Sequence, residues 1–576
     1  MENLAIARLL GEIADLLELK SENPFKIRAY RSAAQVAAES AEPLAGMTDA
    51  QLRAIPGIGK DLAAKIIEIG ATGTAVYHQE LLQQFPPTIL DLLRLQGIGP
   101  KTVALLYETK RIATIEELEA AASAGALRSI KGMGAKKEQL ILKAIAEQKA
   151  HSGRHLLADT AAVAEPLAAY LRERAPGATI DVVGSLRRGC ETCGDLDIVV
   201  SGVTDGGDDV MSAFVAYKQV DRILGQGETK SSVLMFQGYQ ADLRLVAPES
   251  RGAAMQYFTG SKAHNIQLRQ RALNMGLTLN EYGLFKIDTG EKIAGETEEG
   301  LYQALGLAWI DPALRENKGE IAAAELGMLP KLITQGDLRG DLHMHTTETD
   351  GKDDIESMAL AAREMGLEYI AITDHSKALA MANGLDETRA LAHAARVREV
   401  NARLEGITLL AGIECDIKAD GAMDLADDCL AQLDIVIGSV HSAFNLEPAQ
   451  MTARLLRAIE NPYVDIIAHP TGRRLLSREA YTYDMEAVLD AAAKKGVCLE
   501  INSLIERLDL NDAHARLAKQ RGVMLVIDSD AHSRQALAGT RWGVATARRA
   551  WLEADDVLNT RPVEQFRQSL RRNRNR

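Results

Sequence analysis

Residues 184–200 read GSLRRGCETCGDLDIVV and contain two candidate pairs of functional residues. Cys190 and Cys193 form a C-x-x-C, the spacing of a metal knuckle or a redox pair. Asp195 and Asp197 stand two apart at the start of an apolar, β-branched run, so a strand there directs both carboxylates to the same side. No second C-x-x-C, nearby histidine or βαβ context supports the cysteines. We therefore interpret the cysteines as loop residues and the acids as the functional pair.

The composition is that of an ordinary globular protein with several domains. The chain has 576 residues, 47% of them hydrophobic, and a formal net charge of −14. A chain of this length is too long for a single hydrophobic core and is expected to fold as several domains. The charge argues against a uniformly basic nucleic-acid surface but is compatible with local basic surfaces. With five scattered cysteines, no signal-peptide pattern and no membrane-length apolar run, we expect a soluble, cytoplasmic protein without a membrane partner.

The hydrophobic pattern changes along the chain. Residues 1–150 are dominated by helical periodicity. Residues 155–310 indicate an α+β region, with strands expected at 179–183, 195–200, 232–236 and 241–246. A polar stretch at 315–336, with a short helix, is predicted to be a linker. From 338 to 570, apolar runs such as YIAIT and LDIVIGSV alternate with helical segments, which is typical of a βα-barrel with a parallel sheet.

One short pattern recurs three times in the helical region: IPGIGKDLAAKI (55–66), LQGIGPKTVALLY (95–107) and IKGMGAKKEQLIL (130–142). In each copy two glycines precede a helix, where backbone N–H groups can cradle a phosphate. A single copy would be a plain helix–turn–helix connection. Three copies favour the resemblance to helix-hairpin-helix motifs, which bind DNA backbones without sequence preference. The residues expected to contact DNA are Gly57, Gly59, Lys60, Gly97, Gly99, Lys101, Gly132 and Gly134.

The paired acids have a candidate partner in Asp242, at the start of a second expected strand. Three converging carboxylates repel each other unless cations lie between them, and such oxygen ligands suit Mg²⁺ or Mn²⁺. These ions support phosphoryl transfer by activating a hydroxyl and stabilising the leaving phosphate. A D-x-D pattern alone would equally describe solvated acids at a strand end, so the surrounding sequence decides.

The strings GSLRR, GDLDIVV, ADLRLV, YFTGSKAHN and LNEYGLF resemble, in this order, the palm and thumb of family X DNA polymerases, the group that contains DNA polymerase beta. With the hairpins, the resemblance covers residues 1 to about 315. It implies a DNA-directed DNA polymerase that fills short gaps in base excision repair, using gapped or nicked DNA and dNTPs, normally as a monomer. The implied domains are a lyase-like helical domain at 1–83, a fingers-type helical domain at 84–153, a nucleotidyltransferase palm at 154–248, a thumb at 249–315 and a linker at 316–337.

The same resemblance implies roles for individual residues. Asp195, Asp197 and Asp242 would hold the catalytic Mg²⁺ or Mn²⁺, with Arg244 orienting the third carboxylate. Arg269 would lie near the templating base. The implied nucleotide contacts are Gly184, Ser185, Arg188 and Gly194 for the triphosphate, Tyr257, Phe258, Thr259 and Gly260 as the sugar-sensing turn, and Asn265 at the base edge.

The N-terminal region is also similar to the small lyase domain of that family. FKIRAYRSAA and PGIGKDLAAKI match its two signatures, which places a Schiff-base lysine at Lys65 and implies 5′-dRP/AP lyase activity. The family's neighbouring basic residue is Asp61 in this chain, which weakens a 5′-phosphate pocket. A solvated helix lysine is the alternative interpretation of Lys65.

Histidines and acids follow most of the apolar runs of the C-terminal region. Carboxyl ends of barrel strands converge on one mouth, so these side chains can meet there. The chain has 12 histidines, and their concentration at strand ends does not fit the usual core or surface histidine. The mixture suits two to three Mn²⁺ or Zn²⁺ ions, or Fe. The nine predicted ligands are His343, His345, Asp350, His375, Glu414, His441, His469, Asp530 and His532.

These motifs resemble the polymerase and histidinol phosphatase (PHP) domain over residues 338–570, with all nine ligand positions intact. The resemblance implies a metal-dependent phosphoesterase. Its fusion to a polymerase favours a 3′–5′ exonuclease, with AP endonuclease activity as a further expectation. Arg473 is either a phosphate contact or a surface arginine. Two alternatives stay open: a DNA-end-binding protein whose PHP barrel is structural, and a small-molecule phosphatase.

Overall fold

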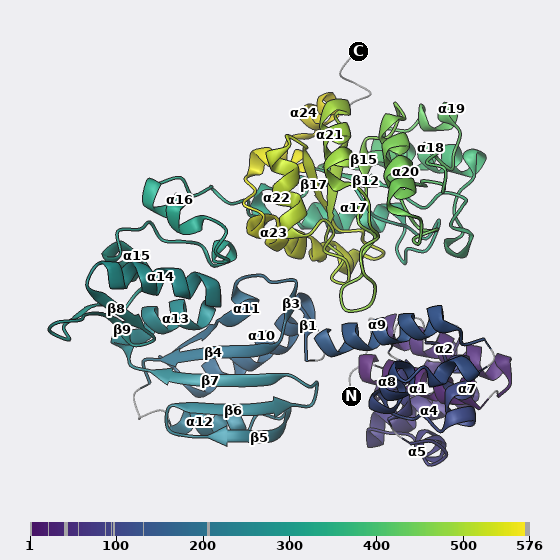
Figure 1. Ribbon diagram of the computed structural model, residues 1–576. Helices are drawn as coiled ribbons and strands as arrows, with labels where there is room; N and C mark the ends of the chain where they lie inside the picture. The colour runs from purple at the N-terminus through teal and green to yellow at the C-terminus, as the bar shows by residue number, and fades with distance from the viewer. Residues whose placement is uncertain are drawn as a thin grey trace. The chain divides into compact units, whose positions relative to one another are not determined.

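The computed structural model (Figure 1) describes residues 3–20, 22–39, 44–55, 57–86, 88–93, 95, 98–130, 132–151, 153–203 and 208–570. The chain divides into two units, Met1–Ser152 and Gly153–Arg576. Among the described residues, none of the helices has both the length and the apolar character that a membrane span requires.

The first unit has a helical core, as predicted. Leu10, Ile13 and Leu17 lie on one face of the first helix, are fully buried, and contact the surrounding helices. The helices are α1 (Asn3–Leu19), α2 (Pro24–Glu39), α3 (Asp49–Ala54), α4 (Lys60–Thr72), α5 (Val76–Leu82), α6 (Ile89–Leu93), α7 (Pro100–Lys110), α8 (Ile115–Ser123) and α9 (Ala135–His151).

The second unit begins with a five-stranded sheet in the order β2-β4-β7-β6-β5. Strands β4 and β7 are parallel, and the other neighbours are antiparallel. Helices α10 and α12 share a core with the sheet, in which Phe214 and Leu243 are buried. The elements are α10 (Leu157–Arg174), β2 (Thr179–Val182), β4 (Asp195–Ser201), α12 (Asp208–Val215), β5 (Val220–Gln226), β6 (Lys230–Met235) and β7 (Gln240–Val246).

Two features of this region differ from the sequence-based expectation. Strand β5 was not predicted, and its residues are mostly exposed and show no alternation. Cys193 is not a loop residue, because β3 (Thr192–Cys193) pairs with β1 (His155–Leu156) and buries the thiol. Cys190 lies in the loop before β3, at intermediate burial.

A smaller helix–sheet region follows the five-stranded sheet. Its core includes Leu268, Leu284 and Tyr302. The segment expected to be a linker contains α16 (Glu320–Leu326), and the buried carboxylate of Glu320 lies 2.7 Å from Nδ1 of His264. The other elements are α13 (Arg251–Thr259), α14 (Lys262–Asn274), β8 (Leu277–Asn280), β9 (Gly283–Lys286), β10 (Lys292–Ala294) and α15 (Glu298–Ala304).

The C-terminal part contains a seven-stranded parallel sheet in sequential order, surrounded by helices (Figure 1). Ile370 and Ile372 pack under the helices, whereas Tyr369 and Ala371 point into an inner core with Phe566. The strands are β11 (Gly340–Asp341), β12 (Tyr369–Ile372), β13 (Thr408–Asp416), β14 (Ile435–Ser439), β15 (Ile466–Ile467), β16 (Cys498–Asn502) and β17 (Leu525–Asp528). The helices are α17 (Ile355–Glu364), α18 (Glu387–Arg403), α19 (Asp427–Leu430), α20 (Pro448–Glu460), α21 (Met485–Lys495), α22 (Asp512–Gln520), α23 (Thr540–Arg549) and α24 (Val563–Ser569).

The first and last strands of this sheet are joined, so it forms the predicted barrel. A parallel bridge connects Met344 to Ala531 beyond the two strand ends. The buried side chain of Asn559 donates to the carbonyl oxygens of Gly340 (2.8 Å) and Ile527 (2.7 Å). Closure brings the residues that follow β11 and β17 to the same mouth.

Candidate active sites

The three acids of the palm lie on neighbouring strands. Asp195 begins β4, Asp197 follows it, and Asp242 is the register partner of Asp197 on β7. Burial, followed by the charges of Asp195 and Asp242, raises the pKa of Asp197 to about 7. Such mutual repulsion between carboxylates is relieved by a divalent cation, so the residues present fit Mg²⁺ or Mn²⁺.

A cavity of about 780 Å³ adjoins Asp195 and Asp197. The structure brings all the residues predicted to contact the nucleotide to this cavity, and Arg269 with them. Arg154, Gln240 and Lys262 also line it and were not predicted. The predicted residues that line it are Gly184, Ser185, Arg188, Gly194, Tyr257, Phe258, Thr259, Gly260, Asn265 and Arg269.

Residues 257–260, predicted as a turn, form the C-terminal end of α13 and its C-cap Gly260, and side chains from two other segments hold them. Arg187 donates to Oγ1 of Thr259 (2.7 Å), and Asn265 donates from Nδ2 to the carbonyl oxygen of Tyr257 (2.8 Å). Arg188 donates to the Thr259 carbonyl and, from Nε, to Glu316 (2.9 Å). The Arg244 guanidinium lies 4.6 Å from the ring centroid of Phe258 and opposes the raised pKa of Asp197.

The nine predicted ligands of the barrel converge at its mouth. They come from the ends of the strands or the loops that follow them, as the barrel geometry requires. Oε1 of Glu414 lies 3.0 Å from Nε2 of His469. Three sets of ligand atoms are close enough to hold an ion each: His345, Asp350, His375 and His532; His343, His345 and Asp530; and His375, Glu414 and His441.

Several side-chain atoms at this mouth that could bind a metal are buried and make no hydrogen bond. Within the described part of the chain, Nε2 of His343, Nδ1 of His345 and Nδ1 of His469 have no such partner. An unsatisfied buried polar atom is costly, and a bound cation removes that cost. Imidazoles mixed with carboxylates fit Zn²⁺, Mn²⁺ or Fe.

Carboxylates behind the ligands orient the imidazoles, and these carboxylates were not predicted. Glu500 accepts from Nδ1 of His343 and from the backbone N–H of His469, both at 2.7 Å. Asp416 lies 2.5 Å from Nδ1 of His441. Such partners fix which ring nitrogen faces a metal. Glu500 lies near the end of an apolar run, as the ligands do, so its position in the sequence could have marked it as a residue of the barrel mouth.

Arg507 is a second residue at the mouth that was not predicted. Its side chain is buried, with Nε 3.9 Å from Oδ2 of Asp530. Among the described residues this Nε has no hydrogen-bond partner. An arginine in this position can donate hydrogen bonds to the oxygens of a phosphate group.

The glycine hairpins of the first unit lead into three helices. Gly59 and Gly99 are the N-caps of α4 and α7, and Gly134 directly precedes α9. Gly57 and Gly132 have φ of +90° and +86°, a region that favours glycine. Lys60 and Lys101 are exposed at the first turns of their helices, and Gly97 lies outside the described residues.

Lys65 lies on α4, and its amine contacts a carboxylate. Nζ is 3.1 Å from Oε2 of Glu68 and 5.7 Å from the ring centroid of Tyr77. Asp61 accepts a hydrogen bond from the hydroxyl of Tyr30 at 3.3 Å. The amine of the predicted nucleophile is therefore paired with the carboxylate of Glu68.

Models of known families match four parts of the chain. They are a helix-hairpin-helix domain at residues 1–75, a SAM-like helix-hairpin-helix tandem at 89–147, a DNA polymerase beta thumb at 254–316 and a PHP domain at 341–504.

Individual relatives agree with these matches. The chain is 36% identical over 575 residues to the DNA polymerase/3'-5' exonuclease PolX of Bacillus subtilis (strain 168), with 100% of both chains covered. It is 31% identical over 233 residues to a probable phosphatase of Shewanella sp. (strain ANA-3), covering 39% of this chain and 88% of that one. A probable phosphatase of Thermoanaerobacter sp. (strain X514) is 32% identical over 232 residues, covering 38% and 89%. The full-length match, with the hairpin, thumb and PHP matches in one chain, shows that this protein belongs to the family X DNA polymerases that carry a PHP domain.

Proposed function

We propose that the chain is a DNA-directed DNA polymerase that also removes nucleotides from 3′ ends, with synthesis at the palm and hydrolysis at the barrel mouth. The observation that carries the proposal is two separate sets of side chains that could hold metal ions in one chain: three carboxylates on β4 and β7, and eight of the nine predicted ligands, all but His469, grouped at the barrel mouth. The printed name of the Bacillus relative combines the same two activities.

At the palm, Asp195, Asp197 and Asp242 would hold Mg²⁺ or Mn²⁺. Such ions supply charge stabilisation for phosphoryl transfer when they are bound. The cavity beside them would hold the incoming dNTP, with Arg188 and Ser185 toward the triphosphate and Asn265 toward the base. Support comes from the convergence of these residues on one cavity.

At the barrel, the nine ligands would hold Mn²⁺ or Zn²⁺, which lower the pKa of a bound water so that it can attack a phosphodiester. Glu500 and Asp416 orient ligand imidazoles through Nδ1. Arg507 would hold the phosphate beside Asp530. These positions support hydrolysis at this site rather than a purely structural barrel.

A small-molecule phosphatase is the second candidate, because two relatives named probable phosphatases match 38–39% of this chain. The hairpins and the thumb favour DNA as the substrate, since neither is needed to hydrolyse a small phosphate ester. We assign the enzyme to gap filling and 3′-end trimming in DNA repair, on gapped or nicked DNA, as a cytoplasmic monomer.

Lyase activity at Lys65 and AP endonuclease activity at the barrel are further parts of the proposal. Borohydride trapping on an abasic-site duplex tests the lyase, with a trapped adduct in the wild type and none in Lys65→Ala. Equal trapping in both would exclude Lys65 as the nucleophile.

The main proposal is tested with a 5′-labelled primer in a gapped duplex. The wild type should lengthen the primer with dNTPs and shorten it without them, and EDTA should abolish both reactions. Release of phosphate from small esters without shortening of the primer would favour the phosphatase instead.

A further inference from the structure

The barrel contacts the loop that follows the predicted triphosphate-binding residues. This 188–191 loop joins α11 (Gly184–Arg187) to β3. Arg549, the last residue of α23, donates from Nη1 to the carbonyl oxygen of Arg188 (3.2 Å) and lies 3.4 Å from Sγ of Cys190. Its Nη2 donates to Asp512 of the barrel (3.1 Å), which fixes the guanidinium from behind.

One carboxylate joins Arg549 to the side chain of Arg188. Oε1 of Glu316 accepts from Nε of Arg188 and from Nη1 of Arg549, both at 2.9 Å. Although burial opposes it, the two guanidinium groups lower the pKa of Glu316, so the carboxylate is ionised. Arg549 therefore holds both the backbone and, through Glu316, the side chain of Arg188.

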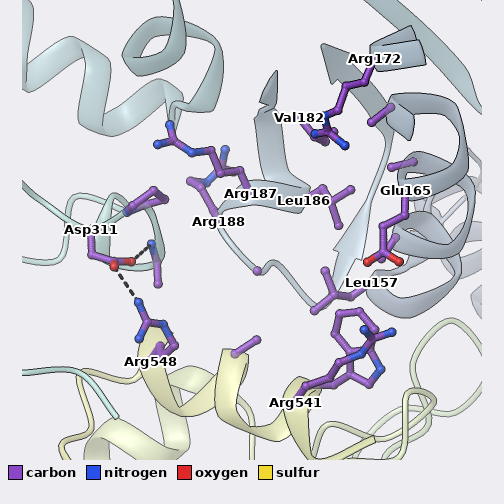
Figure 2. A pocket seen from close by; sticks show the side chains of 18 residues that line it. Leu157, Glu165, Arg172, Val182, Leu186, Arg187, Arg188, Asp311, Arg541 and Arg548 are labelled. Atoms are coloured by element: carbon purple, nitrogen blue, oxygen red, sulfur yellow. Dashed lines mark hydrogen bonds and ion pairs between the residues drawn. The ribbon is translucent and has the colours of Figure 1, made fainter. Parts of the chain in front are cut away.

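Two more arginines of the barrel pair with acids of the polymerase part. Arg473 donates from Nη2 to Glu191 in the same loop at 2.7 Å, and its side chain is buried, so it is not a surface arginine. Arg548 pairs with Asp311 at 2.6 Å (Figure 2). The charges are thus complementary, with arginines on the barrel and acids opposite them.

On its other side the loop lies against α23 through Gly189, at which an added Cβ would come within 3.4 Å of Cβ of Ala545. A cavity of about 570 Å³ lies beside it, lined by Arg187, Arg188 and Gly189 and by residues of α23. Figure 2 shows Arg187 and Arg188 on one side of this cavity and Arg541 and Arg548 on the other. Because side chains do not fill this space, the polar contacts of Arg549 and Arg473 contribute to holding the loop in position.

We propose that Arg549 of the PHP barrel is a positioning residue of the polymerase site, which holds Arg188 in the orientation that receives the triphosphate of the incoming dNTP. The proposal rests on the polymerase function proposed above. It makes the barrel part of the structure that binds dNTP, in addition to its own hydrolytic site.

The test compares Arg549→Ala, Arg549→Lys and a control, Arg521→Ala. Arg521 pairs with Asp490 and Glu486 on the barrel surface, so the control also removes a barrel arginine with two acid partners. The KM for dNTP should rise about tenfold in Arg549→Ala, the effect of losing one charge-assisted contact, with kcat little changed. Arg549→Lys should give an intermediate KM, because a lysine ammonium can keep one ion pair but cannot make the several simultaneous hydrogen bonds of a planar guanidinium. The control and the exonuclease rate of each variant should match the wild type.

Alkylation of Cys190 gives a readout that does not depend on activity. The chain's other four cysteines are buried, and Arg549 lies against the Cys190 thiol. Burial raises the pKa of this thiol and the Arg549 charge opposes that rise, so alkylation rates are compared per thiolate, at the thiol pKa measured for each variant. On this basis Arg549→Ala should speed alkylation of Cys190 alone, because it uncovers the sulfur. An unchanged KM would overturn the proposal, whether or not Cys190 becomes more reactive. If Arg549→Ala does not fold, a wild-type KM in Arg549→Lys would overturn it equally. A wild type that incorporates no dNTP would instead refute the proposed polymerase function.

Discussion

Replacing Gly184 by alanine would place a methyl group against the carboxylate of Asp197. A Cβ at Gly184 would lie 2.5 Å from Oδ2 of Asp197, whereas ordinary contacts begin at 3.4 Å, so the carboxylate must move by about 0.9 Å. A displacement of this size at a reacting centre costs about 100-fold in rate. The φ of +69° adds strain of about 1–2 kcal/mol for any residue other than glycine.

Gly177→Ala is the matched control. Gly177 has φ of +94° and nothing within 4 Å of an added Cβ, so it imposes the backbone strain without the clash. Incorporation of one dNTP into a gapped duplex should fall about 100-fold in Gly184→Ala relative to Gly177→Ala, while 3′ hydrolysis stays unchanged in both. Equal incorporation by the two variants would refute the placement of Asp197 in the reaction.

Three further predictions concern other parts of the chain. Glu500→Gln should slow 3′ hydrolysis about 10–100-fold without affecting incorporation, because Glu500 orients His343; the labelled-primer assay measures both. Lys60→Ala plus Lys101→Ala should weaken binding to all DNA sequences alike and reduce the slope of log K against log salt by about 2, as measured by fluorescence anisotropy. Asn559→Ala should destabilise the barrel by about 2 kcal/mol through the lost hydrogen bonds to Gly340 and Ile527, seen as a lower melting temperature of its calorimetric transition.

Local patterns predicted the elements that carry the sites. Asp195 and Asp197 begin an apolar run, and side chains two apart on a strand point to the same side, which was enough to predict that these acids face one site. The barrel histidines follow apolar runs, and the carboxyl ends of barrel strands meet at one mouth, which was enough to predict that the histidines converge. Strand β5 was not predictable in this way, because an exposed edge strand has no buried face to create alternation.

Contacts between distant segments could not be predicted from local patterns. Glu500 is 157 residues from His343, and Arg549 is 361 residues from Arg188. Cys193 seemed to belong to a loop because its strand is two residues long and exists only through pairing with β1. These features depend on tertiary structure, which one sequence does not record.

The central claim is that synthesis and hydrolysis occur at two separate sites in one chain. It is tested most directly by two double variants, each incubated with a 5′-labelled gapped duplex, with and without dNTPs. Asp195→Ala plus Asp197→Ala should abolish primer extension and leave Mn²⁺-dependent shortening, and His343→Ala plus His345→Ala should do the reverse. If either folded, DNA-bound double variant lost both activities, the two-site account would be contradicted.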